Sequence, residues 1–229
     1  KHIAVSSCNI FSIYFFFGET NMHIDKARVV NYFSSVRNLF KIKTLDREIR
    51  YLLIVSFLFN AGFAFFTSFF NVYLTNKFSF SVGQIGNFFG FVGICSILTQ
   101  LVVVRFVSKR WKHIPVLKFA YILVAVATFA YLLPTKAWMI FLVTPFFAIP
   151  NGLQMANFSA LLTSRTPANV RGETIGISSS FNSLGQALPP LFAGLLAVAF
   201  APSAPILIAS FFMLGAGALF WVTEREVVE

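Results

Sequence analysis

Six long apolar runs dominate this 229-residue chain and limit what it can fold into. A helix rises about 1.5 Å per residue, so about 20 residues cross the roughly 30 Å hydrocarbon core of a bilayer. Each run is that long, and they cover residues 51–76, 82–107, 114–133, 137–163, 175–200 and 204–222. Backbone groups in lipid need hydrogen-bond partners within their own segment, and the runs lack the short alternating pattern of a β-barrel. The sequence therefore predicts an all-α membrane protein with a six-transmembrane-helix bundle over residues 51–222.

Composition supports the membrane class. Only 11% of the residues are charged and 57% are hydrophobic, whereas soluble domains carry about 25% charged residues. The net charge of +10 would suit nucleic acid if the basic residues formed one soluble face, but they lie between the apolar runs. We therefore expect a lipid bilayer as the partner and no nucleic acid.

Basic residues mark every second connection between the runs. One group of connections consists of the stretch 19–50, the links after the second and fourth runs, and the C-terminal tail. Their basic residues after position 50 are Arg105, Lys109, Arg110, Lys112, Arg165, Arg171 and Arg225. The opposite connections carry only Lys77 and Lys136. Because Lys and Arg concentrate on the inner side of a membrane, the first group is predicted to be cytoplasmic, and six crossings make residues 223–229 a cytoplasmic tail.

The N-terminal part precedes these six runs. The apolar segment 1–18 is short for a full span, and it has no small-residue cleavage site of the kind that ends a signal peptide. A trimmed signal peptide is one interpretation, and the truncated end of a transmembrane helix is the one we favour. Residues 19–50 are predicted to be a cytoplasmic central loop, either partly an amphipathic surface helix or a disordered basic linker.

Polar side chains lie at helical spacing in three of the runs. Ser56, Asn60, Phe63, Thr67 and Asn71 follow one another by four, three, four and four residues, so they share one helix face. The fourth run has two amides near its middle, and the fifth repeats a polar residue every four positions. The predicted substrate pathway consists of Asn60, Phe63, Thr67, Asn71, Gln154, Asn157, Asn182 and Gln186.

Two functions suit such polar faces. Each side chain can hydrogen-bond a neighbouring helix and contribute about 0.6 kcal/mol as packing glue. Alternatively, amides and hydroxyls line a solute cavity in which aromatic rings add apolar contact. Because three helices each bring a polar face, we expect the cavity.

Small residues form two further faces. Gly83, Gly86, Gly90 and Gly93 lie on the second run, and a stripe of Gly, Ser, Ala and Pro begins at Gly176 on the fifth. Such faces permit close helix packing. In a transporter, they would also slide or open as one half-bundle rocks against the other.

No catalytic or metal-binding set is visible in the sequence. The three histidines are at or outside the membrane edges, and neither Cys8 nor Cys95 has a second ligand at metal spacing. We therefore predict a protein that is not an enzyme and holds no metal or cofactor. A membrane-embedded lipid-handling protein or enzyme would need a charged or metal-binding cluster, and a channel would need charged rings. Carboxylates are also missing from the middle of the spans, so either a proton-coupling group lies outside these six spans or the protein is not a proton antiporter.

Two segments resemble helices ten and eleven of the major facilitator superfamily. They run from Pro150 to Thr163 and from Arg171 to Gly194, and they are most similar to the drug and tetracycline efflux branch. In that branch, an Arg-Gly pair is followed by a glycine, a run of small polar residues and a Gly-Pro pair. This chain has Leu188-Pro189-Pro190 in place of the Gly-Pro pair. Phe17-Gly18-Glu19-Thr20 is similar to the Pro-Glu-Thr end of the sixth helix.

The resemblance implies the C-terminal half of a 12-helix transporter, from the end of helix six to helix twelve, whose N-terminal six-helix half is missing. It implies alternating access and efflux of small amphipathic molecules from a bacterial inner membrane, with protons as a candidate coupling ion for an antiporter. Uptake of a nutrient or metabolite is the alternative. The implied cytoplasmic loop motifs comprise Arg105, Lys109, Arg110, Arg171 and Gly172.

Overall fold

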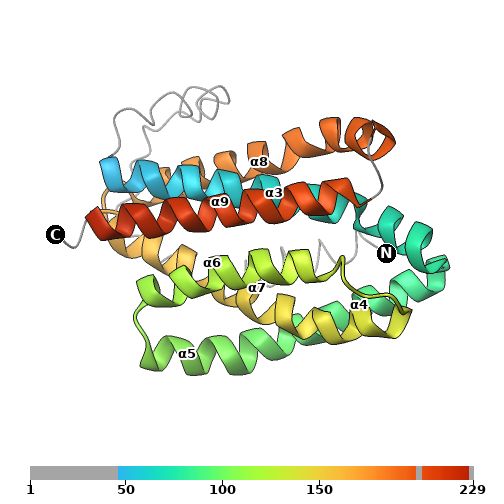
Figure 1. Cartoon of the computed structure of the whole chain (residues 1–229). Helices are drawn as coiled ribbons and strands as arrows, with labels where there is room; N and C mark the ends of the chain where they lie inside the picture. The colour runs from blue at the N-terminus through green and yellow to red at the C-terminus, as the bar shows by residue number, and fades with distance from the viewer. Residues whose placement is uncertain (1–45, 200–202, 227–229) are drawn as a thin grey trace, which may run out of the picture. The chain divides into compact units, whose positions relative to one another are not determined.

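The computed structural model describes residues 46–199 and 203–226. The predicted partial helix 1–18 and nearly all of the predicted loop 19–50 lie outside these residues. The elements are α3 (Arg47–Phe78), α4 (Val82–Leu98), the π-helix η2 (Thr99–Val104), α5 (Arg105–Arg110), α6 (His113–Ala130), α7 (Ala137–Arg165), α8 (Arg171–Ala199) and α9 (Ala204–Glu226) (Figure 1). Most of each predicted run lies in a helix, although α6 ends at Ala130, before the predicted end of its run at residue 133. α4, η2 and α5 together make one rod.

Five of these helical rods are long and apolar enough to cross a membrane: α3, the α4–η2–α5 rod, α6, α7 and α9. The predicted all-α membrane fold is thus confirmed. The remaining predicted span, α8, has 29 residues, the same length as α7, but its stripe of Ser, Asn and Gln lowers its hydropathy.

Helix ends extend beyond the apolar runs. α3 begins at Arg47, so its first turn occupies the last four residues of the predicted 19–50 loop. α9 continues to Glu226, so the predicted tail 223–229 begins as helix. α8 begins at Arg171 rather than at residue 175. Charged residues are tolerated in the first and last turns because these turns reach the lipid headgroups and water.

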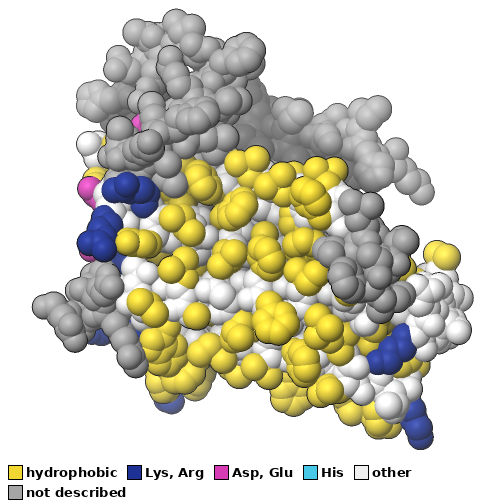
Figure 2. Space-filling view, turned by 45° about the horizontal axis from the view of Figure 1, so that its top comes forward, with side chains coloured by type: hydrophobic (Ala, Val, Ile, Leu, Met, Phe, Trp, Pro, Cys, Tyr) yellow, Lys and Arg dark blue, Asp and Glu magenta, His cyan; other side chains and the backbone are white. Residues whose placement is uncertain are grey.

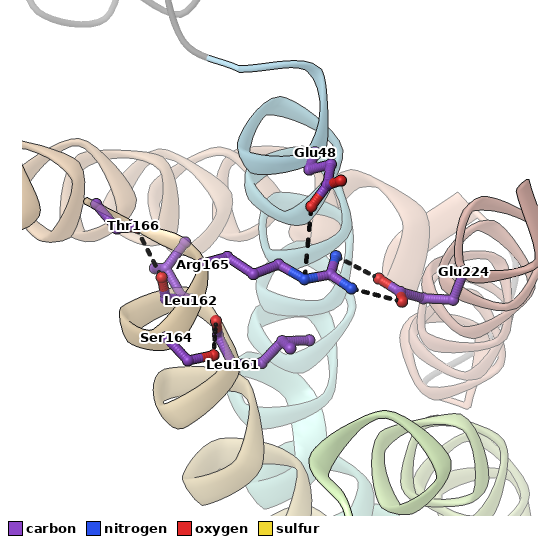
Figure 3. A network of polar contacts seen from close by, with 7 residues as sticks. All are labelled: Glu48, Leu161, Leu162, Ser164, Arg165, Thr166 and Glu224. Carbon is purple, nitrogen blue, oxygen red and sulfur yellow. Dashed lines mark hydrogen bonds and ion pairs between the residues drawn. The ribbon is translucent and has the colours of Figure 1, made fainter. Parts of the chain in front are cut away.

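The helices are antiparallel neighbours. At one end of the bundle, the Arg165 side chain of α7 reaches Glu48 at the start of α3 and Glu224 near the end of α9 (Figure 3). At the other end, Lys77 Nζ donates a 2.8 Å hydrogen bond to the Leu132 carbonyl that follows α6. We call these the Arg165 end and the Lys77 end of the bundle.

The central helix α3 packs mainly against α8 and α9, while α6 lies between α7 and α9 (Figure 1). Aromatic rings fill the junction of α3 with α6 and α7. The ring of Phe66 lies 5.1 Å from that of Phe147 and 5.5 Å from that of Tyr131, measured between centroids. Tilted and edge-on ring pairs of this kind add about 0.5–1.5 kcal/mol each to the energy of burial.

Glycines set the two closest helix contacts of α3. A Cβ at Gly62 would lie 2.9 Å from the Ala209 carbonyl oxygen of α9, and one at Gly185 of α8 would lie 2.8 Å from the Phe57 carbonyl oxygen. By contrast, a Cβ at Gly86, Gly90 or Gly93 would meet no described atom within 4 Å. The predicted small-residue face of α4 is therefore open within the described part of the chain.

The surface matches a membrane environment. Hydrophobic side chains cover the middle of the visible face in Figure 2, and Lys and Arg gather toward its two ends. The α4–η2–α5 rod is the most exposed span, with 6% of its most apolar window buried. It starts at a capping box, in which Gln84 N–H donates to Ser81 Oγ at 3.3 Å and Ser81 N–H donates to Gln84 Oε1 at 2.9 Å.

Candidate functional site: a cavity between α3, α7 and α8

A cavity of about 230 Å³ lies where the polar faces of three helices meet. Its lining residues are Ser56, Phe59, Asn60, Phe63, Asn151, Gln154, Met155, Phe158, Ser159, Asn182 and Gln186. Five of the predicted pathway residues are among them, so the stripes on α3, α7 and α8 do converge on one space.

Amides from α3 and α8 form a hydrogen-bonded ladder on one wall. Asn182 Oδ1 accepts from Ser56 Oγ and, at 3.1 Å, from Asn60 Nδ2. Asn60 Oδ1 in turn accepts from Gln186 Nε2 at 3.1 Å. With two donors aimed at one Asn182 atom, that atom must be the oxygen, which leaves Asn182 Nδ2 and Gln186 Oε1 without partners among the described residues.

The opposite wall contains a buried polar atom with no partner. Gln154 is 4% exposed, and its Nε2 donates to the Tyr121 hydroxyl of α6 at 3.2 Å. Its Oε1 is buried and has no hydrogen-bond partner in the described protein. An unpaired buried acceptor costs about 1–3 kcal/mol, and such atoms are uncommon unless a function or a bound molecule explains them.

The rest of the wall is aromatic and uncharged. Phe59 and Phe63 of α3 and Phe158 of α7 contribute rings, and no Asp, Glu, Lys, Arg or His is among the described lining residues. Free amide donors and acceptors beside rings suit a small neutral or zwitterionic molecule with an apolar part.

Three predicted pathway residues lie outside the cavity. Asn157 is 1% exposed; its Nδ2 donates to the Leu153 carbonyl at 2.8 Å, and its Oδ1 lies 2.8 Å from His113 Nδ1. Because the Asn157 oxygen accepts, the His113 Nδ1 atom must carry a proton. Thr67 and Asn71 continue the α3 stripe as exposed residues, and the Thr67 hydroxyl donates to its own helix at Phe63 O, 3.0 Å away.

The predicted loop motifs are exposed at the Arg165 end. Arg105, Lys109 and Arg110 lie on α5, where the Arg110 guanidinium sits 4.9 Å from the Phe106 ring centroid. Arg171 and Gly172 start α8. The central ion network of this end instead uses Arg165, Glu48 and Glu224 (Figure 3).

The predicted pathway omitted six of the lining residues, Ser56, Phe59, Asn151, Met155, Phe158 and Ser159, and also Tyr121, which holds Gln154 from behind the wall. Tyr121 is fully buried in α6, and a buried tyrosine hydroxyl usually needs a partner, which was the available signal. Ser159 follows Met155 by one turn and donates to its carbonyl at 3.1 Å. Its polarity within an apolar helix was the only hint that it faces the cavity.

Comparison with known families agrees with this architecture. No curated protein is similar enough to the chain to count as a match. The family model of the Major Facilitator Superfamily matches residues 30–229, which include all the described helices and the cavity. The chain therefore belongs to the major facilitator superfamily of membrane transporters.

Proposed function

We propose that this chain forms the C-terminal half of a secondary transporter that exports small amphipathic compounds across a bacterial cytoplasmic membrane. The observation that carries the proposal is the uncharged cavity between α3, α7 and α8, with amides on two sides and phenylalanine rings between them. Asn182 Nδ2 and Gln186 Oε1, which have no partner among the described residues, give a solute one donor and one acceptor.

Alternating access requires a second half-bundle that moves against this one. The exposed part of the α3 stripe at Thr67 and Asn71, and the open glycine face of α4, are the surfaces we assign to that contact. A six-helix N-terminal half would complete the solute path there. We therefore expect no flux from residues 1–229 expressed alone.

The coupling ion is constrained by where the acidic groups lie. Glu48, Glu173 and Glu224 sit in the terminal turns of α3, α8 and α9, and none of them lines the cavity. A proton antiporter would thus need its titrating group in the other half of the protein. The positive-inside bias supports the orientation in which the Arg165 end is cytoplasmic.

Transport by the full-length protein tests the proposal. Everted vesicles carrying it should accumulate at least one compound from a panel of dyes and antibiotics when a proton gradient is imposed, and a protonophore should abolish the accumulation. Accumulation only in right-side-out vesicles would support the alternative, nutrient or metabolite uptake. Absence of gradient-dependent flux in both preparations would contradict the transport proposal.

A further inference from the structure

A second cavity lies between α6 and α9. This groove measures about 280 Å³ and is lined by Ala125, Val126, Phe129, Ser210, Phe211 and Leu214. Ser210, its polar member, donates its hydroxyl to the Leu207 carbonyl of its own helix at 2.7 Å. The groove therefore offers an apolar surface, and Phe211 on its rim is 69% exposed.

The cation Lys118 lies beyond this groove, toward the Arg165 end. Lys118 is the sixth residue of α6, and its ammonium lies 5.4 Å from the ring centroid of Trp221 on α9. Phe119 meets the same Trp221 ring edge-on at 6.4 Å. Glu224, one turn from Trp221, is already bound to Arg165, so Lys118 has no acidic partner among the side chains that the structure describes.

Lys118 and the groove belong to one strip of the surface. Position 118 is separated from 125, 126 and 129 by seven, eight and eleven residues, which places them on the same face of α6. Trp221 is likewise seven residues from Leu214 on α9. Lys118 and Val126 are about 12 Å apart along the helix axis, so the cation lies near the end of the span and the groove nearer its middle.

We propose that this strip binds one anionic phospholipid in the leaflet at the Arg165 end. Its phosphate contacts Lys118 beside Trp221, and one acyl chain occupies the groove between α6 and α9. Charge complementarity argues for this occupant: the phosphate of a zwitterionic lipid is already balanced by the ammonium group of its own headgroup, whereas that of an anionic lipid is not, and a soluble anion leaves the apolar groove unfilled. Tryptophan at the level of the headgroups also suits its amphipathic ring.

Trp221 itself reports on the site. The chain has three tryptophans. In the full-length protein, Trp111→Phe and Trp138→Phe, with any tryptophan outside residues 1–229 also replaced by Phe, leave Trp221 as the one fluorescent reporter. In vesicles of mixed lipid, brominated phosphatidylglycerol should quench Trp221 with an affinity about fivefold above that of brominated phosphatidylcholine, as expected for one basic residue at an anionic lipid.

Two variants and one control make the test specific. Lys118→Gln should reduce the fivefold preference to none, while Lys112→Gln, which removes an exposed cation at the same end, should keep it. Val126→Phe fills the groove and should weaken quenching by the anionic lipid. Circular dichroism and gel filtration establish that each variant retains the fold.

Three results would overturn the proposal. Equal quenching by both lipids would mean that the site does not select charge. If Lys112→Gln abolished the preference for the anionic lipid as Lys118→Gln does, the preference would come from the combined positive charge of the Arg165 end and not from Lys118. Absence of quenching by either lipid would mean that protein, such as a second copy of the chain, covers this face. None of these results bears on the solute cavity, so the transport proposal is tested separately.

Discussion

Arg165, the last residue of α7, donates two parallel hydrogen bonds to Glu224 of α9, from Nη1 to Oε1 at 2.7 Å and from Nη2 to Oε2 at 2.8 Å. The Glu224 side chain is 1% exposed and that of Arg165 is 15% exposed. Glu48 of α3 approaches Arg165 Nε at 3.7 Å but is 47% exposed. One guanidinium therefore joins three helix ends, with one buried and one solvated partner (Figure 3).

The two carboxylates should differ in their contributions to stability. Glu224→Gln leaves the Arg165 charge without its buried counterion, and we expect a loss of about 3 kcal/mol or more in the free energy of unfolding. Glu48→Gln removes an exposed partner and should cost less than about 1 kcal/mol. Denaturant unfolding of the full-length protein in detergent measures both. Equal losses would contradict the assigned burial.

The contact of α3 with α8 should not tolerate a side chain at Gly185. Gly185→Ala places a methyl group 2.8 Å from the Phe57 carbonyl oxygen, so the helices must separate, and we expect a cost of about 1–3 kcal/mol from overpacking. Gly176→Ala, on the same helix, meets no described atom within 4 Å and should be neutral or slightly stabilising, because alanine favours helix. Thermal melting compares the two variants.

Removal of the Tyr121 hydroxyl should destabilise the protein through Gln154. Tyr121→Phe leaves both polar atoms of the buried Gln154 amide unpaired, at a cost of about 1–3 kcal/mol. Tyr51→Phe is the control, because the Tyr51 hydroxyl accepts two solvent-exposed hydrogen bonds from Arg47, at 3.4 and 3.3 Å, and we expect a change near zero there. A second substitution, Gln154→Leu, should recover part of the stability lost in Tyr121→Phe, and failure to do so would disprove the coupling.

Asn182 should control solute binding. Asn182→Ala removes a free donor and the acceptor shared by Ser56 and Asn60, so we expect the apparent KM for transport to rise about tenfold, the equivalent of one hydrogen bond of the stronger kind. Ser183→Ala changes an exposed neighbour whose hydroxyl bonds its own helix at Ser179 O, and transport should be unaffected. An unchanged KM in Asn182→Ala would remove this residue from the pathway.

Labelling of single cysteines should give opposite results at the two ends of the bundle. With Cys8, Cys95 and any other native cysteine replaced, Lys136→Cys should react with a membrane-impermeant maleimide in intact cells. Lys112→Cys should react only after the cells are opened, because the positive-inside bias places it in the cytoplasm. The reverse pattern would invert the orientation and leave the fold unchanged.

Most of the helical framework could be predicted because it depends on local properties. Six apolar runs of sufficient length dictate six helices, whichever way these pack, and each observed helix contains most of its predicted run. The boundaries were less accurate at α8, which begins at Arg171. An apolar run ends where lipid ends, whereas a helix continues through charged residues into the interface.

The cavity could be predicted only in part. A repeat of three or four residues identifies which side chains share a face, so Asn60, Asn182 and Gln186 were expected to point toward the interior of the bundle. Which partner each one meets depends on the axial offset between two helices, and that is a property of tertiary packing. For this reason Asn157, one turn beyond Gln154, was assigned to the pathway although it contacts His113 at the start of α6.

The π-helical segment η2 divides its span into two parts whose side chains are out of register with those of one continuous α-helix. A π-turn accommodates one residue more than an α-turn, which advances the positions after Val104 by about 100° around the axis. The cations of α5 consequently lie about 100° around the rod from the positions, relative to the α4 glycines, that an uninterrupted α-helix would give them. Relaxation of this wide turn to ordinary α geometry would swivel the α5 cations around the rod while the α4 glycines stayed in place.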